Sequence, residues 1–103
     1  MNKHSYRIVF HAHFLRWLEK ESDKSQAQIG NRLKRIQLHA HFGDHKCVDR
    51  VNGIYELRWK NGRRVYFVHQ ARQANKMIFI LLGGNKNGQD QDIKKAKILI
   101  QSY

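Results

Sequence analysis

Two neighbouring segments of the chain carry basic side chains in a pattern that suits the binding of phosphate. Arg58 and Arg64 flank an Asn-Gly turn signal, and an arginine guanidinium binds a phosphate through two parallel hydrogen bonds. A lysine beside other cations can have its pKa lowered and then transfer protons. An aromatic ring can stack on a nucleobase. The sequence therefore offers candidates for phosphate binding, proton transfer and base stacking, which are, in that order, Arg58 and Arg64, Lys46 and Lys86, and Tyr66.

The element that must position these residues is a hairpin. The segments on either side of Asn61-Gly62 alternate between apolar and polar residues, and such a dipeptide between two alternating runs is a strong hairpin signal. A two-residue loop would mix polar and apolar side chains on one face, whereas a three-residue loop that includes Arg63 keeps them apart and pairs Arg58 with Tyr66. We therefore expect the three-residue loop. The exposed face opposite the core then carries Glu56, Arg58, Arg64 and Tyr66.

The remaining periodicities predict a mixed α+β fold. Apolar residues recur at helical spacing over residues 11–20 and 25–41, and again in a last helix that Asn87 is expected to cap. The predicted order is β-α-α-β-β-β-β-α, with strands over residues 5–10, 46–51, 54–60, 64–69 and 76–82. We expect one domain over residues 1–103, in which a twisted, mainly antiparallel sheet carries all three helices on its apolar side.

The charge of the chain narrows the class of partner. Its 20 Lys and Arg residues against 8 Asp and Glu residues give a formal net charge of +12, which favours a polyanion such as nucleic acid, a ribosome or an acidic protein. A hydrophobic fraction of 41% with 11% aromatics is too high for a disordered basic tail. On the second predicted helix, the side chains of Arg32, Lys34 and Arg35 lie off the apolar stripe. We expect these three side chains to contact phosphates.

The single cysteine excludes an intramolecular disulfide and indicates a reducing compartment, so we expect a cytoplasmic protein. The longest apolar run, residues 77–82, is far too short to cross a bilayer, and we expect no membrane partner. A zinc site comes into consideration because His39, His41, His45 and Cys47 lie close together in sequence. However, the two rings of a His-x-His pair on a helix point apart, and no second ligand pair occurs elsewhere. We therefore expect no metal and no cofactor.

Several short motifs follow one another along the chain in a recognisable order. They are Phe42-Gly43-Asp44-x-Lys46, Tyr55-Glu56-Leu57-Arg58, Arg64-Val65-Tyr66-Phe67, Leu81-Leu82-Gly83-Gly84-Asn85-Lys86, and Gln89 followed by Asp92-Ile93-Lys94-Lys95-Ala96-Lys97. The ordered set covers nearly the whole chain and resembles the RelE/ParE superfamily of bacterial toxins, in the branch of addiction-module killer or HigB-like proteins. The chain departs from that pattern at Arg63, where the family usually has an aromatic residue.

The resemblance implies a RelE-like fold and a bacterial toxin that cleaves mRNA on the ribosome without a metal. Cleavage of RNA through its own 2′-hydroxyl requires proton removal, stabilisation of the phosphorane charge and protonation of the leaving 5′-oxygen. Arg58 and Arg64 are expected to stabilise this charge, Lys46 and Lys86 to transfer protons or contact phosphate, and Glu56 to orient an arginine. The RNA-contacting residues are expected to be Tyr66, Arg63, Arg32, Arg35 and Lys34.

The resemblance also implies a partner and leaves other functions open. The partner would be a small antitoxin with a helix-turn-helix region, and the complex would contact operator DNA only through that antitoxin. Some members of the superfamily poison DNA gyrase instead of cleaving mRNA, and such a toxin would share the fold and the basic surface. A non-catalytic nucleic-acid-binding module is a third possibility. Charge alone does not distinguish these three functions.

Overall fold

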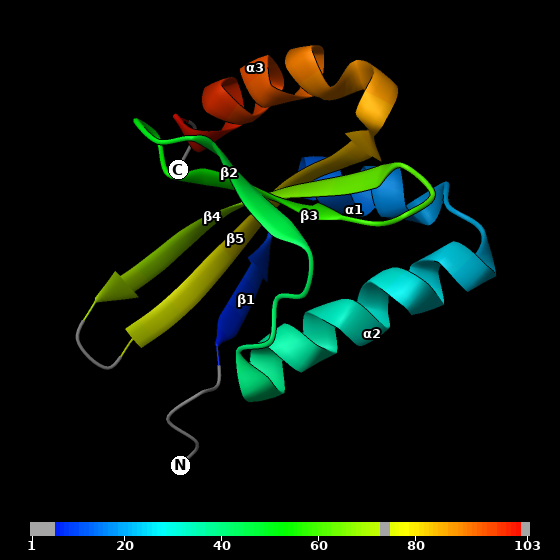
Figure 1. Ribbon diagram of the computed structural model, residues 1–103, viewed down its shortest axis with the longest axis horizontal. Helices are drawn as coiled ribbons and strands as arrows, with labels where there is room; N and C mark the ends of the chain where they lie inside the picture. The colour runs from blue at the N-terminus through cyan, green and yellow to red at the C-terminus, as the bar shows by residue number, and fades with distance from the viewer. Residues whose placement is uncertain (1–5, 73–74, 102–103) are drawn as a thin grey trace.

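The computed structural model describes residues 6–72 and 75–101 and contains the predicted order of elements. Three helices and five strands follow one another, with a short 3-10 turn before the last helix (Figure 1). The elements are β1 (Arg7–Phe10), α1 (Ala12–Glu19), α2 (Asp23–His39), β2 (His45–Asp49), β3 (Ile54–Arg58), β4 (Arg63–Arg72), β5 (Asn75–Asn85), η1 (Lys86–Gly88) and α3 (Gln89–Ile100). The α+β fold class is therefore confirmed.

The five strands form one sheet in the order β1-β5-β4-β3-β2. Neighbouring strands are antiparallel except β1 and β5, which run parallel. β5 lies inside the sheet between β1 and β4, which agrees with a segment that is apolar on both faces. Among the helices in the described residues, none is long and apolar enough to span a membrane.

The helices cover both faces of the sheet, so the expectation that all three lie on one side is wrong. α1 and α2 pack on the face that carries Leu57, Val65 and Phe67. α3 packs on the opposite face, where Ala96 meets a second buried cluster that includes Tyr66. Figure 1 shows α3 on one side of the sheet and α1 and α2 on the other. The physical reason is that Ile54, Tyr66, Val68 and Leu82 make part of the second face apolar as well, and the stripe of Ile93, Ala96, Leu99 and Ile100 covers it.

The hairpin between β3 and β4 has a three-residue loop, but the loop consists of Lys60, Asn61 and Gly62. The Trp59 N–H donates to the Arg63 carbonyl at 3.1 Å, and Gly62 takes a φ of +99°, which favours glycine. Arg63 therefore belongs to β4, where it also pairs with β5. The predicted pairing of Arg58 with Tyr66 is wrong by two residues. Since the shift is even, every side chain still lies on its predicted face.

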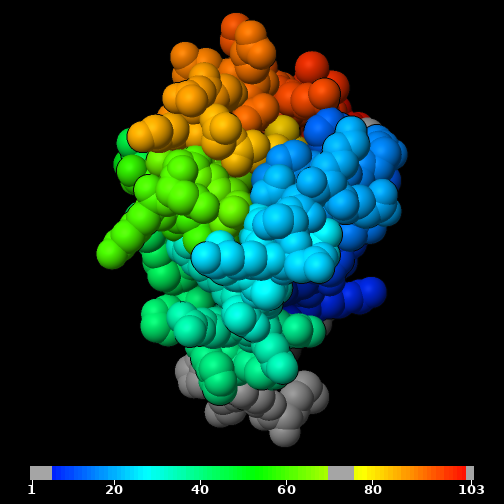
Figure 2. Space-filling model, turned by 90° about the vertical axis from the view of Figure 1, so that its right-hand side faces the viewer, coloured from blue at the N-terminus to red at the C-terminus, as the bar shows by residue number. Residues whose placement is uncertain are grey.

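The start of α3 also differs from the prediction. Asn87 does not cap it: the Asn85 side-chain oxygen accepts a hydrogen bond from the Asn87 backbone N–H at 2.9 Å and caps η1 instead. α3 then begins after Gly88 without a side-chain cap. Figure 2 views the end of the molecule where this turn meets the β3–β4 hairpin and α1. This end of the sheet holds most of the predicted site residues.

Candidate functional site

The strand register brings five of the predicted site residues onto the face of the sheet that α3 covers. One cross-strand row contains Arg58 on β3 and Arg64 on β4. The adjacent row contains Lys46 on β2, Glu56 on β3 and Tyr66 on β4. Directly paired residues in a sheet share a face and lie close together. The predicted cationic site is therefore one continuous patch of neighbouring side chains.

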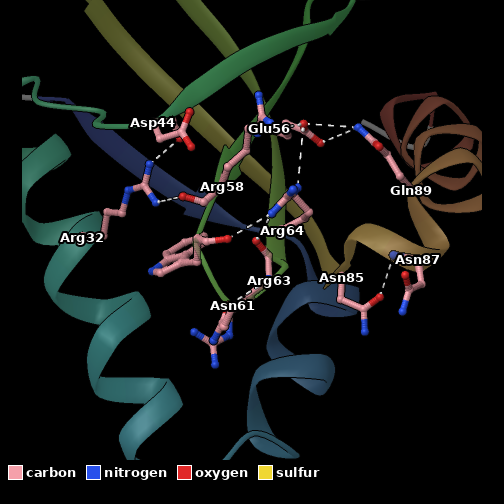
Figure 3. A network of polar contacts seen from close by, with 11 residues as sticks. Arg32, Asp44, Glu56, Arg58, Asn61, Arg63, Arg64, Asn85, Asn87 and Gln89 are labelled. Carbon is pink, nitrogen blue, oxygen red and sulfur yellow. Dashed lines mark hydrogen bonds and ion pairs between the residues drawn. The ribbon is translucent and has the colours of Figure 1, made fainter.

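Glu56 is the centre of this patch. Its carboxylate is almost fully buried, with 1% of the residue exposed. Glu56 Oε1 lies 3.8 Å from Arg58 Nε and 3.9 Å from Arg64 Nε, so that one carboxylate pairs with both guanidinium groups. From α3, Gln89 Nε2 donates to the two carboxylate oxygens at 3.2 and 3.0 Å (Figure 3). This geometry suits the orienting role predicted for Glu56.

The expectation of an exposed polar face is wrong. Tyr66 is 0% exposed, and α3 packs over it. A ring without exposed surface cannot stack on a nucleobase, so this arrangement does not support the predicted stacking role of Tyr66. Burial raises the pKa of the Tyr66 phenol, and the nearby carboxylates of Glu56 and Asp92 raise it further. Tyr66 is therefore a neutral phenol at physiological pH.

The two arginines differ in accessibility. Arg64 keeps only 11% of its side chain exposed, and its Nη1 donates to the carbonyls of Trp59 at 3.2 Å and Arg63 at 2.9 Å. Arg58 keeps 37% of its side chain exposed. The ion pair to Glu56 is made through Nε, and the two terminal nitrogens of Arg58 make no hydrogen bond or ion pair with the described part of the chain. Arg58 is thus the better placed of the two for contact with phosphate.

Both predicted lysines are exposed and lie at the margin of the patch. Lys46 is the cross-strand neighbour of Glu56 on the edge strand β2. The Lys86 backbone N–H donates to the Gly62 carbonyl at 2.8 Å, and the stem of its side chain lies beside Gly62. Lys86 is therefore at the tip of the hairpin, next to the row of Arg58 and Arg64.

Arg32 has a structural role that the sequence did not predict, because its guanidinium binds backbone carbonyls of the loop before β2. Its Nε and Nη2 donate to the Phe42 carbonyl at 3.1 and 2.9 Å, and its terminal nitrogens also donate to the carbonyls of Asp44 and Arg58. The guanidinium lies 4.5 Å from the centre of the Trp59 ring. Because these contacts tie α2 to the loop before β2, we leave Arg32 out of the candidate site.

The other predicted RNA-contacting residues lie on the α1 and α2 side of the sheet. Lys34 and Arg35 are exposed on α2, which packs against the face opposite the patch. Arg63 makes an ion pair with Glu21, with 3.4 Å between Nε and Oε1, and its Nη1 donates to Gln28 at 3.1 Å. The structure does not bring Lys34, Arg35 or Arg63 together with Arg58.

Two residues of α3 were missed as site residues. Gln89 holds the Glu56 carboxylate, and Asp92 approaches the sheet so closely that a Cβ on Gly84 would lie 2.2 Å from its Oδ2. Burial raises the pKa of the Asp92 carboxyl, although Lys95 lowers it by a smaller amount. The available signal was their spacing, because residues three apart at the start of a helix point in the same direction.

The described residues contain no group of three or more His, Cys, Asp or Glu side chains placed to hold a metal ion. The sheet topology and the placement of the helices match the RelE-like fold. A variant of the Escherichia coli toxin RelE in the free state superposes with a TM-score of 0.67 at 14% identity, over 91% of this chain and 95% of that chain. A chain of the intact E. coli RelBE toxin–antitoxin complex gives a TM-score of 0.64 at 15% identity, over 79% and 96%.

Sequence comparison places the chain in a family. Residues 16–101 match the family model of the phage-derived Gp49-like proteins (DUF891). A Haemophilus influenzae protein described as uncharacterized is 42% identical over 86 residues, which are 82% of this chain and 83% of the relative. The chain belongs to the Gp49-like family. Its predicted resemblance to the RelE/ParE superfamily is confirmed in the fold.

Proposed function

We propose that this protein is the toxin of a toxin–antitoxin pair and acts as a ribosome-dependent mRNA endoribonuclease without a metal. The observation that carries the proposal is the clamp of Arg58 and Arg64 on the buried carboxylate of Glu56. A surface arginine is usually solvated and unpaired, whereas these two share one buried counter-charge at one end of the sheet. Preorganised cations of this kind stabilise the charge that develops on a phosphorane.

Each side chain of the patch has a separate role in the proposed cleavage reaction. The terminal nitrogens of Arg58 contact the scissile phosphate, and Arg64 adds a second positive charge behind it. Lys46 and Lys86 are exposed at the margin of the patch and are the groups that take the proton from the 2′-hydroxyl and protonate the 5′-oxygen. Tyr66 is an unsuitable base, because burial keeps its phenol protonated.

The proposed toxin function also implies which partners the protein binds. The cognate antitoxin would be a small protein with a helix-turn-helix region that covers the basic site, and operator DNA would be contacted through the antitoxin. The E. coli relative is known from a toxin–antitoxin complex, which is consistent with such a partner. The bacterial cytoplasm, where ribosomes and mRNA occur, would be the site of action.

Primer extension on a translated mRNA, with and without ribosomes, tests the proposal. We expect the wild type to cut mRNA only in the presence of ribosomes, and Arg58→Ala to cut about 100-fold more slowly. Arg50→Ala removes the same charge from an exposed turn outside the site and should cut at the wild-type rate. Intact mRNA with double-strand DNA breaks on expression would instead select a gyrase poison, and salt-sensitive binding without either effect would select a non-catalytic module.

A further inference from the structure

Arg63 is the first residue of β4, and its side chain extends from the β3–β4 hairpin to the junction between α1 and α2. Its Nε lies 3.4 Å from Oε1 of Glu21, which follows α1, and its Nη1 donates to Oε1 of Gln28 on α2 at 3.1 Å. Only 13% of the Arg63 side chain is exposed. Two of the nitrogens of this guanidinium are therefore bound within the protein, and Arg63 joins the hairpin to the α1–α2 junction.

The α1–α2 junction is cross-linked by hydrogen bonds of its own. The Ser25 hydroxyl on α2 donates to Glu21 Oε1 at 2.7 Å, the same carboxylate oxygen that pairs with Arg63. The side chain of Gln26, also on α2, donates through Nε2 to the backbone carbonyls of Leu18 at 3.0 Å and Glu21 at 3.2 Å. Glu21 is thus bound to α2 through both its side chain and its backbone, which makes it an anchor for the arginine.

The backbone of Arg63 supports the neighbouring arginine of the candidate site. Consecutive residues of a strand point to opposite faces, so Arg63 reaches α1 and α2 while Arg64 lies on the side of α3. The Arg63 carbonyl accepts a hydrogen bond from the Trp59 backbone N–H at 3.1 Å and another from Arg64 Nη1 at 2.9 Å. Arg64 Nη1 also donates to the Trp59 carbonyl at 3.2 Å. A shift of this end of the hairpin would therefore move both carbonyls that bind the Arg64 guanidinium.

The ring of Trp59 connects the hairpin to α2 a second time. The guanidinium carbons of Arg32 and Arg63 lie 4.5 and 5.9 Å from the centre of the ring, where a cation is attracted to the π-system. Arg32 also donates through Nη1 to the carbonyl of Arg58 (Figure 3). The helices therefore contact the hairpin on both sides of its loop, at the backbone of Arg58 and at the side chain of Arg63.

We propose that Arg63 is a positioning residue for RNA cleavage, which binds Glu21 and Gln28 and thereby places the carbonyls that hold the Arg64 guanidinium. This inference rests on the proposed endoribonuclease function. Arg63 contacts no RNA in this role and acts only through Arg64, the second positive charge behind the scissile phosphate. A displacement of about 1 Å far from the chemistry can slow a reaction by about 100-fold, so the contact with Glu21 should control the rate of cleavage.

Two substitutions remove this contact from opposite ends. Glu21→Ala removes the carboxylate, and Arg63→Met removes the guanidinium but keeps most of the aliphatic stem. We expect each to lower kcat for cleavage of mRNA on ribosomes by about tenfold and to leave KM unchanged. Since both remove the same contact, the double variant should cut no more slowly than the slower single variant. The two substitutions change the net charge in opposite directions, so an effect of charge on ribosome binding would instead move KM in opposite directions.

Two further variants control for charge and for folding. Glu19→Ala removes the same kind of charge from an exposed position at the end of α1 and should cut at the wild-type rate. Arg63→Lys keeps a cation that can pair with Glu21 but has no second nitrogen for Gln28, so it should recover part of the rate that Arg63→Met loses. Urea unfolding of every variant defines conditions in which all of them are folded, and the rates are compared under those conditions.

The possible outcomes separate this proposal from the one on which it rests. If Arg63→Met raises KM and Glu21→Ala has no effect, then Arg63 binds RNA or the ribosome directly and the inference is wrong. If the losses in the two single variants multiply in the double variant, the two residues act independently and the inference also fails. Wild-type rates in both single variants would overturn the inference and leave the endoribonuclease function standing. If the wild type does not cut mRNA, both proposals are overturned.

Discussion

Single buried charges control the candidate site. Glu56 is buried between two guanidinium groups and the amide of Gln89. A buried carboxylate is tolerated only when it is paired and hydrogen-bonded, and these contacts provide both conditions. The ion pair of Arg58 with Glu56 is made through Nε, so it does not occupy the terminal nitrogens of that guanidinium. The stability of the site and its proposed chemistry therefore depend on the same few atoms.

Asp92 lies on α3 close to the candidate site, and the pH dependence of the protein's stability can measure how far its carboxyl is desolvated. Burial raises the pKa of its carboxyl in the folded protein, so the folded state holds the proton more tightly than the unfolded chain. Stability should therefore fall as the pH rises from about 4 through the folded pKa. We expect Asp92→Asn to lose less stability than the wild type between pH 4 and pH 7. Urea unfolding across this range measures the difference.

The control for this prediction lies in the same helical turn. Asp90 is exposed at the start of α3, and Asp90→Asn makes the same chemical change at a side chain that is not packed against the sheet. Its pH profile should run parallel to that of the wild type. If Asp92→Asn also runs parallel to the wild type, then Asp92 is not desolvated by the packing of α3.

At the scale of elements, the order and type of the helices and strands could be predicted because periodicity is a local signal. The side of the sheet that α3 covers could not. β3 and β4 place Ile54 and Tyr66 among charged residues, so both faces are partly apolar and only long-range packing decides between them. The face of the sheet on which each site residue lies could be predicted, because alternate residues of a strand point to the same face. The contacts of Arg32 could not, since one of them is a carbonyl 26 residues further along the chain.

α3 and the candidate site are linked by Gln89. A hydrogen bond to a charged group stabilises a protein by about 1.5–3 kcal/mol, and the amide of Gln89 reaches both oxygens of Glu56. We expect Gln89→Ala to lower the free energy of unfolding by about 2 kcal/mol and to slow RNA cleavage, because Glu56 then holds the arginines less firmly. Denaturant unfolding and primer extension measure the two effects.

Gln91→Ala gives the matched comparison on the same helix. Gln91 is exposed, so the substitution should change stability by less than about 0.5 kcal/mol. Equal effects of the two substitutions would mean that helix propensity, and not the contact with Glu56, accounts for the loss.

For the whole molecule, the net charge of +12 exceeds what the site uses. Lys34 and Arg35 lie on α2, opposite the patch, and their positive charge is free to contact a phosphate-rich surface. Lys94 and Lys95 are exposed on α3, on the other side of the sheet. The two pairs carry the same charge on opposite sides, so they can show which side of the protein faces the ribosome.

Ribosome association should weaken steeply with salt, because each phosphate contact releases counterions. We expect the slope of log affinity against log salt to become shallower by about 1–2 in the double variant Lys34→Ala, Arg35→Ala. The double variant Lys94→Ala, Lys95→Ala removes the same charge and should keep the wild-type slope. Sedimentation with ribosomes at a series of salt concentrations measures all three. If both double variants lower the salt slope equally, the positive charge attracts the ribosome as a diffuse field rather than through contacts on one side. If the affinity of the wild type does not change with salt, the positive charge binds an acidic antitoxin instead of the ribosome.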